Sequence, residues 1–155
     1  MKNYILIIIF SLSVLQTACG PEIIILFIPA ITAFWCVEDD PCHKFRLRPD
    51  NKTKDNGFQG AVGGLEFYVN PADGKAYQDP EFQKEGENFI AGAFENLNIA
   101  FTVTSPEPSY GLAEREYVGA MEVENDTVSR MVLQSLTDGR QLVLARPPSS
   151  DCECE

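Results

Sequence analysis

Positive charge is scarce in this sequence of 155 residues. Its 12 lysines and arginines stand against 23 aspartates and glutamates, so the net charge is −11 at neutral pH. Such a chain repels a phosphate backbone, which argues against nucleic acid as a partner, and it also repels an anionic membrane surface. Attachment to a membrane would therefore need apolar or covalent anchoring.

Histidine is scarcer still, because His43 is the only one in the chain. A serine–histidine–aspartate triad would have to use it, and we expect it at the surface beside Cys42, without an orienting partner. Nucleophile-elbow, phosphate-loop and zincin motifs are missing as well. A hydrolase with two carboxylates is an alternative, but no motif selects one pair among the 23 acids. The sequence predicts a non-enzymatic protein without a cofactor.

The N-terminal stretch "MKNYILIIIFSLSVLQTACGPE" has the three-part plan of a secretory signal. Lys2 supplies a positive charge, and residues 4–15 form an apolar run that is too short to cross a bilayer. Threonine and alanine then directly precede Cys19, and glycine follows it. With these residues the segment resembles the precursor of a bacterial lipoprotein. The resemblance implies that residues 1–18 are a cleaved signal peptide and that Cys19 is lipidated and becomes the first residue of the mature chain.

The same resemblance implies a location in the cell. A lipidated Cys19 would hold the protein on a membrane of the cell envelope, facing the periplasm or the cell surface. The expected partners are then the membrane, through the lipid, and another envelope protein. The predicted function is that of an exported, lipid-anchored binding or structural module.

A second apolar run, residues 23–36, lies in the segment 19–44 that would follow the anchor. It has 14 residues and contains Pro29, so it is too short for a regular membrane span. Five of the six residues 23–28 are isoleucine or leucine and the sixth is phenylalanine, a composition that suits a buried strand. A core strand is our main interpretation, and a segment in the membrane interface or a true span are the alternatives.

Five cysteines are an odd number for an exported chain. Lipidation of Cys19 would leave four, in two clusters: Cys36 with Cys42, and Cys152 with Cys154 in the C-terminal tail 149–155. We expect two disulfides, since oxidising compartments permit them. Three pairings are possible, of which Cys152 with Cys154 is the least comfortable because one residue separates them. Bridges between the clusters would close loops of about 100 residues or more, worth about 4–5 kcal/mol each.

The same residues allow two other interpretations. Cys36, Cys42, His43, Cys152 and Cys154 could together hold a zinc or copper(I) ion or a small ligand. However, their spacing differs from the paired C-x2-C knuckles of zinc sites. Free thiols are the third possibility.

Residues 45–148 are predicted to form a single β-rich domain. Phe45 and Leu47 alternate with arginines, which is typical of a strand, and residues 61–69 return to an extended pattern after a polar loop. Two runs rich in β-formers flank Asp138 and Gly139, a pair that favours a hairpin with a type I′ turn. A short helix over residues 128–136 is the alternative for the first of these runs.

One helix is expected near residues 80–97. Asp79 can cap it, Pro80 suits the first helical position, and apolar residues including Phe82, Phe89 and Phe94 recur at helical spacing. The predicted fold class is therefore α+β: a small β-rich domain with an antiparallel or sandwich-like sheet and one packed helix.

Overall fold

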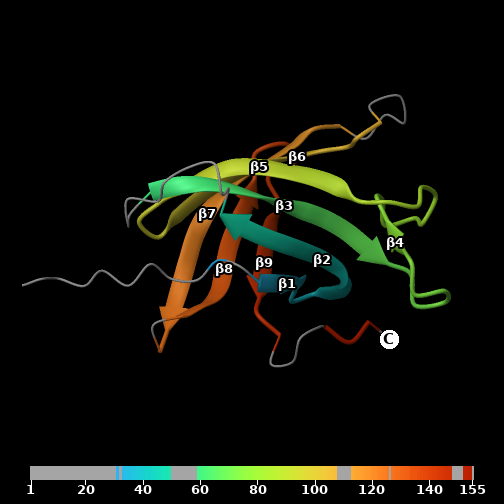
Figure 1. Ribbon diagram of the computed structural model, residues 1–155, viewed down its shortest axis with the longest axis horizontal. Helices are drawn as coiled ribbons and strands as arrows, with labels where there is room; N and C mark the ends of the chain where they lie inside the picture. Colours follow the sequence, from blue (N-terminus) through green and yellow to red (C-terminus); the bar gives the residue numbers. More distant parts are fainter. Residues whose placement is uncertain are drawn as a thin grey trace, which may run out of the picture.

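The fold of this protein is all-β (Figure 1). The computed structural model describes residues 31, 33–49, 59–107, 113–125, 127–147 and 152–154. Over these ranges the chain forms strands and no helix, so they contain no helix that could cross a membrane. The predicted α+β class is therefore wrong.

Eight of the strands close into an up-and-down barrel. The strands are β1 (Ala33–Val37), β2 (Asp40–Pro49), β3 (Gln59–Val69), β4 (Ala76–Tyr77), β5 (Asn88–Glu95), β6 (Asn98–Thr104), β7 (Arg115–Glu124), β8 (Thr127–Ser135) and β9 (Gln141–Ala145). Apart from the short β4, which pairs with the end of β3, each strand is antiparallel to its two neighbours in the barrel. Pairing of β1 with β9 closes the ring, so full closure leaves no long open edge.

The seam between β1 and β9 is short. Its register contains only Cys36 opposite Ala145 and Val37 opposite Leu144, with one more backbone bond from Glu38 to Val143 (2.9 Å). Most neighbouring strands elsewhere in the barrel pair over five or more residues. The seam is therefore the place where the barrel has the fewest backbone hydrogen bonds.

Large side chains fill the inside of the barrel. The fully buried ones include Trp35, Phe45, Leu47, Met131, Leu133 and Leu144. Phe45, Phe101 and Tyr117 form an aromatic cluster with ring centroids 5.4–6.4 Å apart. This interior is a packed core of the kind that small eight-stranded barrels have.

The strand predictions for β2 and β3 are confirmed. In β2 the side chains of Phe45 and Leu47 are fully buried, while Arg46 and Arg48 are exposed, as a period of two requires. The run 61–69 lies in β3. Of the apolar run 23–36, only Ile31 and the residues from Ala33 onward are described, and Ala33–Val37 is strand β1.

The predicted helix near residues 80–97 is wrong, because the chain turns at its start and then continues as β5. Asp79 does act as a cap, but its carboxylate accepts bonds from the amides of Glu81, Gln83 and Lys84 in a turn. Phe82 (φ 56°) and Gly86 (φ 134°) have left-handed backbone angles that a helix cannot contain. The apolar spacing that indicated a helix also fits a strand with alternate residues inside.

The predicted hairpin at Asp138 and Gly139 is confirmed, and the alternative helix over residues 128–136 is wrong. Strands β8 and β9 flank this turn in antiparallel register. The turn is not of type I′, however. Gly139 has a positive φ of 72° but Asp138 does not, and Ser135 and Arg140 are joined by a backbone bond of 2.8 Å.

Candidate functional site

Two cysteine bridges clasp the C-terminal tail to the outside of strands β1 and β2. Cys36 is joined to Cys152 and Cys42 to Cys154, with Cα–Cα distances of 6.2 and 4.8 Å. The disulfide prediction is thereby confirmed, with both bridges running between the two clusters. Cys19 lies outside the described residues, and its lipidation stays a prediction.

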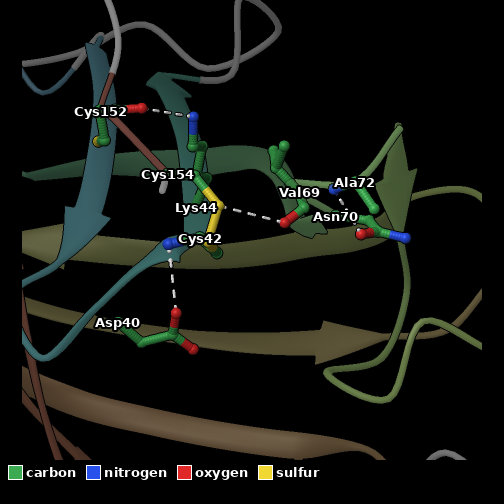
Figure 2. Close-up of a disulfide and its surroundings, with 8 residues drawn as sticks. All are labelled: Asp40, Cys42, Lys44, Val69, Asn70, Ala72, Cys152 and Cys154. Carbon is green, nitrogen blue, oxygen red and sulfur yellow. Dashed lines mark hydrogen bonds between the residues drawn. A yellow bond between two sulfur atoms is a disulfide. The ribbon is translucent and has the colours of Figure 1, made fainter. Parts of the chain in front are cut away.

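The clasped tail covers a lysine (Figure 2). Lys44 lies on the outer face of β2, in register with Cys36, yet it is only 3% exposed. Its ammonium group donates a hydrogen bond of 2.9 Å to the carbonyl oxygen of Cys152. The disulfide sulfur of Cys154 lies 3.4 Å from the carbonyl oxygen of Val69, so the tail reaches from β1 to the end of β3. The bridges therefore turn the last residues of the chain into a fixed cover.

The structure does not bring His43 to the cysteines, because strand alternation separates them. Cys42 faces outward under the tail, whereas the neighbouring His43 faces inward and is only 6% exposed. The prediction of a surface histidine is therefore wrong. No group of three or more histidine, cysteine or acidic side chains that could hold a metal occurs in the described ranges. A metal site built from His43 and the four cysteines does not fit this geometry.

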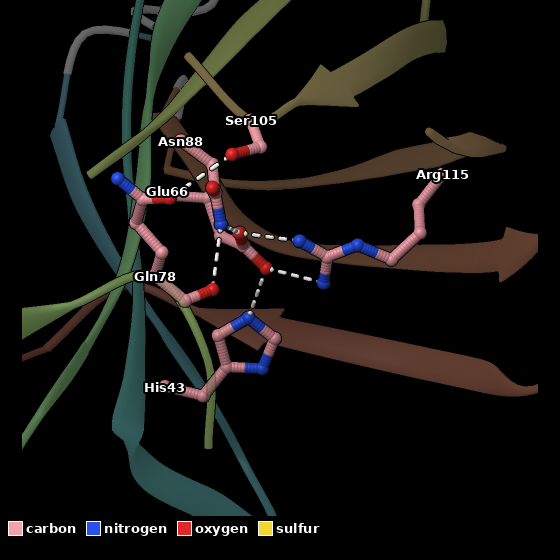
Figure 3. A network of polar contacts seen from close by, with 6 residues as sticks. All are labelled: His43, Glu66, Gln78, Asn88, Ser105 and Arg115. Atoms are coloured by element: carbon pink, nitrogen blue, oxygen red, sulfur yellow. Dashed lines mark hydrogen bonds and ion pairs between the residues drawn. The ribbon is translucent and has the colours of Figure 1, made fainter. Parts of the chain in front are cut away.

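His43 instead belongs to a polar network that fills one end of the barrel (Figure 3). Glu66 on β3 is its centre and is completely buried. One carboxylate oxygen of Glu66 lies 2.7 Å from Nε2 of His43, and Arg115 donates two hydrogen bonds to the carboxylate, at 2.8 and 2.7 Å. Asn88 donates to Glu66 (2.6 Å) and to the carbonyl oxygen of Gln78 (2.8 Å). We call this end of the molecule the polar end.

The network keeps its central carboxylate ionised. Burial alone would raise the pKa of Glu66, but the hydrogen bonds and charges of His43 and Arg115 outweigh burial and lower it. Burial is also the main cause that raises the pKa of Tyr68, whose ring stacks on His43 at a centroid distance of 4.1 Å. Each carboxylate oxygen of the fully buried Glu66 lies within hydrogen-bond distance of two protein nitrogens, whereas the buried side-chain oxygen of Asn88 has no partner among the described residues. The network therefore satisfies its central carboxylate without solvent.

A large groove lies on the outside of the barrel, across strands β3, β5, β6, β7, β8 and β9. Its volume is about 1280 Å³. One residue from each strand forms its central row, and consecutive members of that row are register partners: Ala61, Ala93, Ala100, Val118, Gln134 and Gln141. Ala61 is partly exposed, and the other five residues of this row are exposed. We call this feature the outer groove.

Small residues make the floor of the outer groove. Alanine is depleted in strands because it fills a pleated surface poorly, yet Ala61, Ala93 and Ala100 stand side by side here, and Ala120 lies next to them. Gly119 lies under the same surface, and a Cβ at this position would overlap the carbonyl oxygen of Val132 on β8. Small side chains and close strands thus leave room for larger groups from outside.

Two exposed large hydrophobic residues lie in or beside the outer groove: Val118 is part of its lining, and Leu136 is part of an adjoining depression. In the described part of the chain, the exposed large hydrophobic residues are Phe89 (53%), Leu97 (45%), Val118 (38%), Val123 (42%) and Leu136 (57%). All five lie on β5 or β7 or next to β5 and β8. A shallow depression of about 160 Å³ that contains Leu136 and Glu116 shares Ala100 and Val118 with the groove.

Comparisons with known proteins give no guide to the chemistry. No family model, no curated protein and no solved structure matches this chain. The candidate site therefore has to be judged on its own geometry.

Sequence reasoning missed both the network and the groove. Glu66 and Arg115 are 49 positions apart, and no local pattern connects them. The sequence does contain a sign of the groove, because glycine stands next to alanine in three strands, at 60–61, 91–93 and 119–120. Its meaning depends on the strand register, which places these small residues on nearby strands.

Proposed function

We propose that this protein is an exported, lipid-anchored module of the cell envelope that binds another envelope component through the outer groove. The pair of cysteine bridges is the observation that carries the proposal. Bridges of this kind form in oxidising compartments outside the cytoplasm. They also use four of the five cysteines and leave Cys19, the residue of the lipobox-like segment, as the odd one.

A binding role agrees better with the barrel than catalysis does. His43 and Glu66, the residues with the most reactive side chains in the core, are bonded to each other and closed off from solvent. The interior around them is filled by aromatic and aliphatic side chains. The outer groove, in contrast, combines a large open volume with a floor of small residues and the exposed side chain of Val118, so it can receive a partner from outside.

The anchor is tested by expressing the full chain in a bacterial host with labelled palmitate. We expect the label on the wild-type protein and its loss in Cys19→Ala, with the intact mass showing cleavage before residue 19. The matched control is the double variant Cys42→Ser/Cys154→Ser, which also changes cysteines and should keep the label. Mature protein that retains Cys19 without a lipid would overturn the anchor.

The compartment is tested by counting thiols in denatured, non-reduced protein. Two disulfides should leave no reactive thiol among Cys36, Cys42, Cys152 and Cys154 when the protein is made with its own N-terminus. Four reactive thiols in that preparation would contradict export to an oxidising compartment.

A further inference from the structure

We propose that the occupant of the outer groove is an apolar segment of a partner protein that carries lysine or arginine side chains. This inference rests on the proposed function, in which the groove is the binding surface, and it adds the chemical class of the partner. Three observations carry it: the length of the groove, the size of its floor residues and the charges beside it.

The dimensions of the groove fit a short stretch of polypeptide. Its central row crosses six neighbouring strands, which at a spacing of about 4.8 Å gives a path of about 24 Å along the curved outer face of the barrel. An extended segment of about seven residues that follows this curve has the same length. The floor offers alanine side chains and exposed Val118, so large apolar side chains of the partner would find both space and apolar contact.

The charges beside the groove select a cationic partner. Glu95 lines the groove and Glu116 lines the adjoining depression, and among the described residues no lysine or arginine lines either feature. In the described ranges neither glutamate forms an ion pair. Five cations of the described ranges pair with acids that do not line the groove, in the pairs Arg46–Glu87, Lys75–Glu85, Lys84–Glu107, Arg130–Glu38 and Arg140–Asp138. Of these cations, Arg140 directly precedes Gln141 of the groove lining. A partner with cations next to its apolar residues would complement this surface.

A second copy of the chain fits less well as the occupant. It carries the same net charge of −11, so self-association through this face works against repulsion.

The test measures the binding of two fluorescein-labelled peptides of equal length to the purified product of the full chain. One peptide alternates leucine with lysine and the other alternates leucine with glutamate. Fluorescence anisotropy should show the leucine–lysine peptide binding at least about tenfold more tightly than the leucine–glutamate peptide. Equal affinity for the two peptides would overturn the cationic class of the partner.

Variants locate the binding. Ala100→Trp fills the floor from the outside and should weaken binding of the leucine–lysine peptide by about tenfold, whereas the exposed control Ala72→Trp should not change it. Glu95→Lys should weaken binding by about threefold or more, and the matched charge control Asp39→Lys by less than about twofold. Unchanged affinity in Ala100→Trp, with thermal unfolding like that of wild type, would show that the peptide binds elsewhere and would overturn the proposal. The same holds if Glu95→Lys and Asp39→Lys weaken binding equally.

Sedimentation of the unliganded protein completes the test. A dimer that is present in wild type and lost in Ala100→Trp would assign the groove to a second copy and overturn the proposal, while a monomer supports it. The peptide assay is made in solution and does not depend on a lipid at Cys19. Failure of the anchor and failure of the groove are therefore separate results.

Discussion

The two sides of this barrel are held together in different ways. On the side of β1 to β4, which we call the clasped half, two disulfides fix the tail, and the outer surface carries the ion pairs Arg46–Glu87 and Lys75–Glu85. On the side of β5 to β9, the groove half, no disulfide occurs among the described residues, and the outer surface forms the outer groove together with the first residues of β3. Small and exposed apolar side chains lie on this surface.

This difference shows a division of labour within one sheet. The clasped half gains stability from covalent links and covers its own surface, including Lys44, with the tail. The groove half leaves its surface open and relies on strand pairing and on the shared core. A surface that must receive a partner cannot also be covered by its own chain, so the covalent reinforcement lies where it does not obstruct the groove.

Removing the clasp should have the largest effect. The bridge from Cys36 to Cys152 spans 116 positions, and closing a loop of that size stabilises the fold by about 4–5 kcal/mol through the unfolded state. We expect the fourfold serine variant at positions 36, 42, 152 and 154 to lose at least that free energy of unfolding. Urea denaturation followed by circular dichroism measures the loss.

The double variant Cys42→Ser/Cys154→Ser is the control for the clasp. It keeps the bridge from Cys36 to Cys152, so the long loop stays closed and the second bridge closes only a short additional loop. Its loss should be clearly smaller than that of the fourfold variant. Equal losses would mean that local packing of the tail, and not loop closure, stabilises the clasped half.

Glu66→Gln should have the next largest effect. The polar network joins the two halves, because Glu66 and His43 come from β3 and β2 and Arg115 comes from β7. Neutralising the carboxylate leaves the half-buried guanidinium without its counter-charge, which costs about 3 kcal/mol of unfolding free energy. The matched control Glu87→Gln removes an exposed ion pair with Arg46 and should cost less than about 1 kcal/mol. Similar losses in the two variants would contradict the central role of Glu66.

The same carboxylate predicts sensitivity to acid. The pKa of Glu66 is lower in the folded protein than in the unfolded chain, where it is near 4.5. Its contribution to stability is therefore complete above the unfolded value and is lost as the pH falls towards the folded value. Between about pH 5 and about pH 3, wild type should lose more unfolding free energy than Glu66→Gln. If the unfolding free energies of the two proteins fall in parallel over this range, Glu66 does not cause the loss of stability in acid.

The sequence was informative where a signal is local. The alternation around Phe45 and Leu47 predicted β2, and the Asp138-Gly139 pair predicted the last hairpin. The helix near residues 80–97 failed because Ile90 and Phe94, four positions apart, satisfy both a helical and an alternating pattern. In the structure, closure of the barrel decides between them, since Ile90 and Phe94 are buried and Phe89 is exposed.

Features that depend on strand register could not be predicted from the sequence. The cysteine pattern announced two bridges but left three pairings open, and only the position of the tail over β1 and β2 distinguishes them. The predicted surface position of His43 was wrong because one step along a strand moves a side chain from the outer face to the core. No residue near His43 in the sequence indicated that Glu66 would be its partner. Long-range pairing of strands creates both results.

The shape of the groove half is tested by a pair of glycine variants. A Cβ at Gly119 would overlap the backbone carbonyl of Val132, so Gly119→Ala should force β7 and β8 apart and cost about 2 kcal/mol. At Gly63 the nearest atom to a new Cβ is the carbonyl oxygen of Ile90 at 3.7 Å, an ordinary contact, so Gly63→Ala should be nearly neutral. Thermal unfolding compares them. Equal stability would show that the strands under the groove can separate freely.

The smallest effect is expected at the seam between the two halves. Arg130 on β8 reaches across β9 and donates two hydrogen bonds, at 2.7 and 2.9 Å, to the carboxylate of Glu38 in the β1–β2 turn. This pair lowers the pKa of Glu38, but both side chains are largely open to solvent, where water and salt weaken the attraction.

Arg130→Ala should therefore leave the midpoint of thermal unfolding close to that of wild type, both in low and in high salt. The matched control Arg140→Ala removes an exposed cation from the β8–β9 turn, away from the seam. A lower midpoint in Arg130→Ala alone, abolished by salt, would show that the ion pair holds the seam closed. The sparse pairing of β1 with β9 would then be a weak point of the clasped half that the disulfides do not secure.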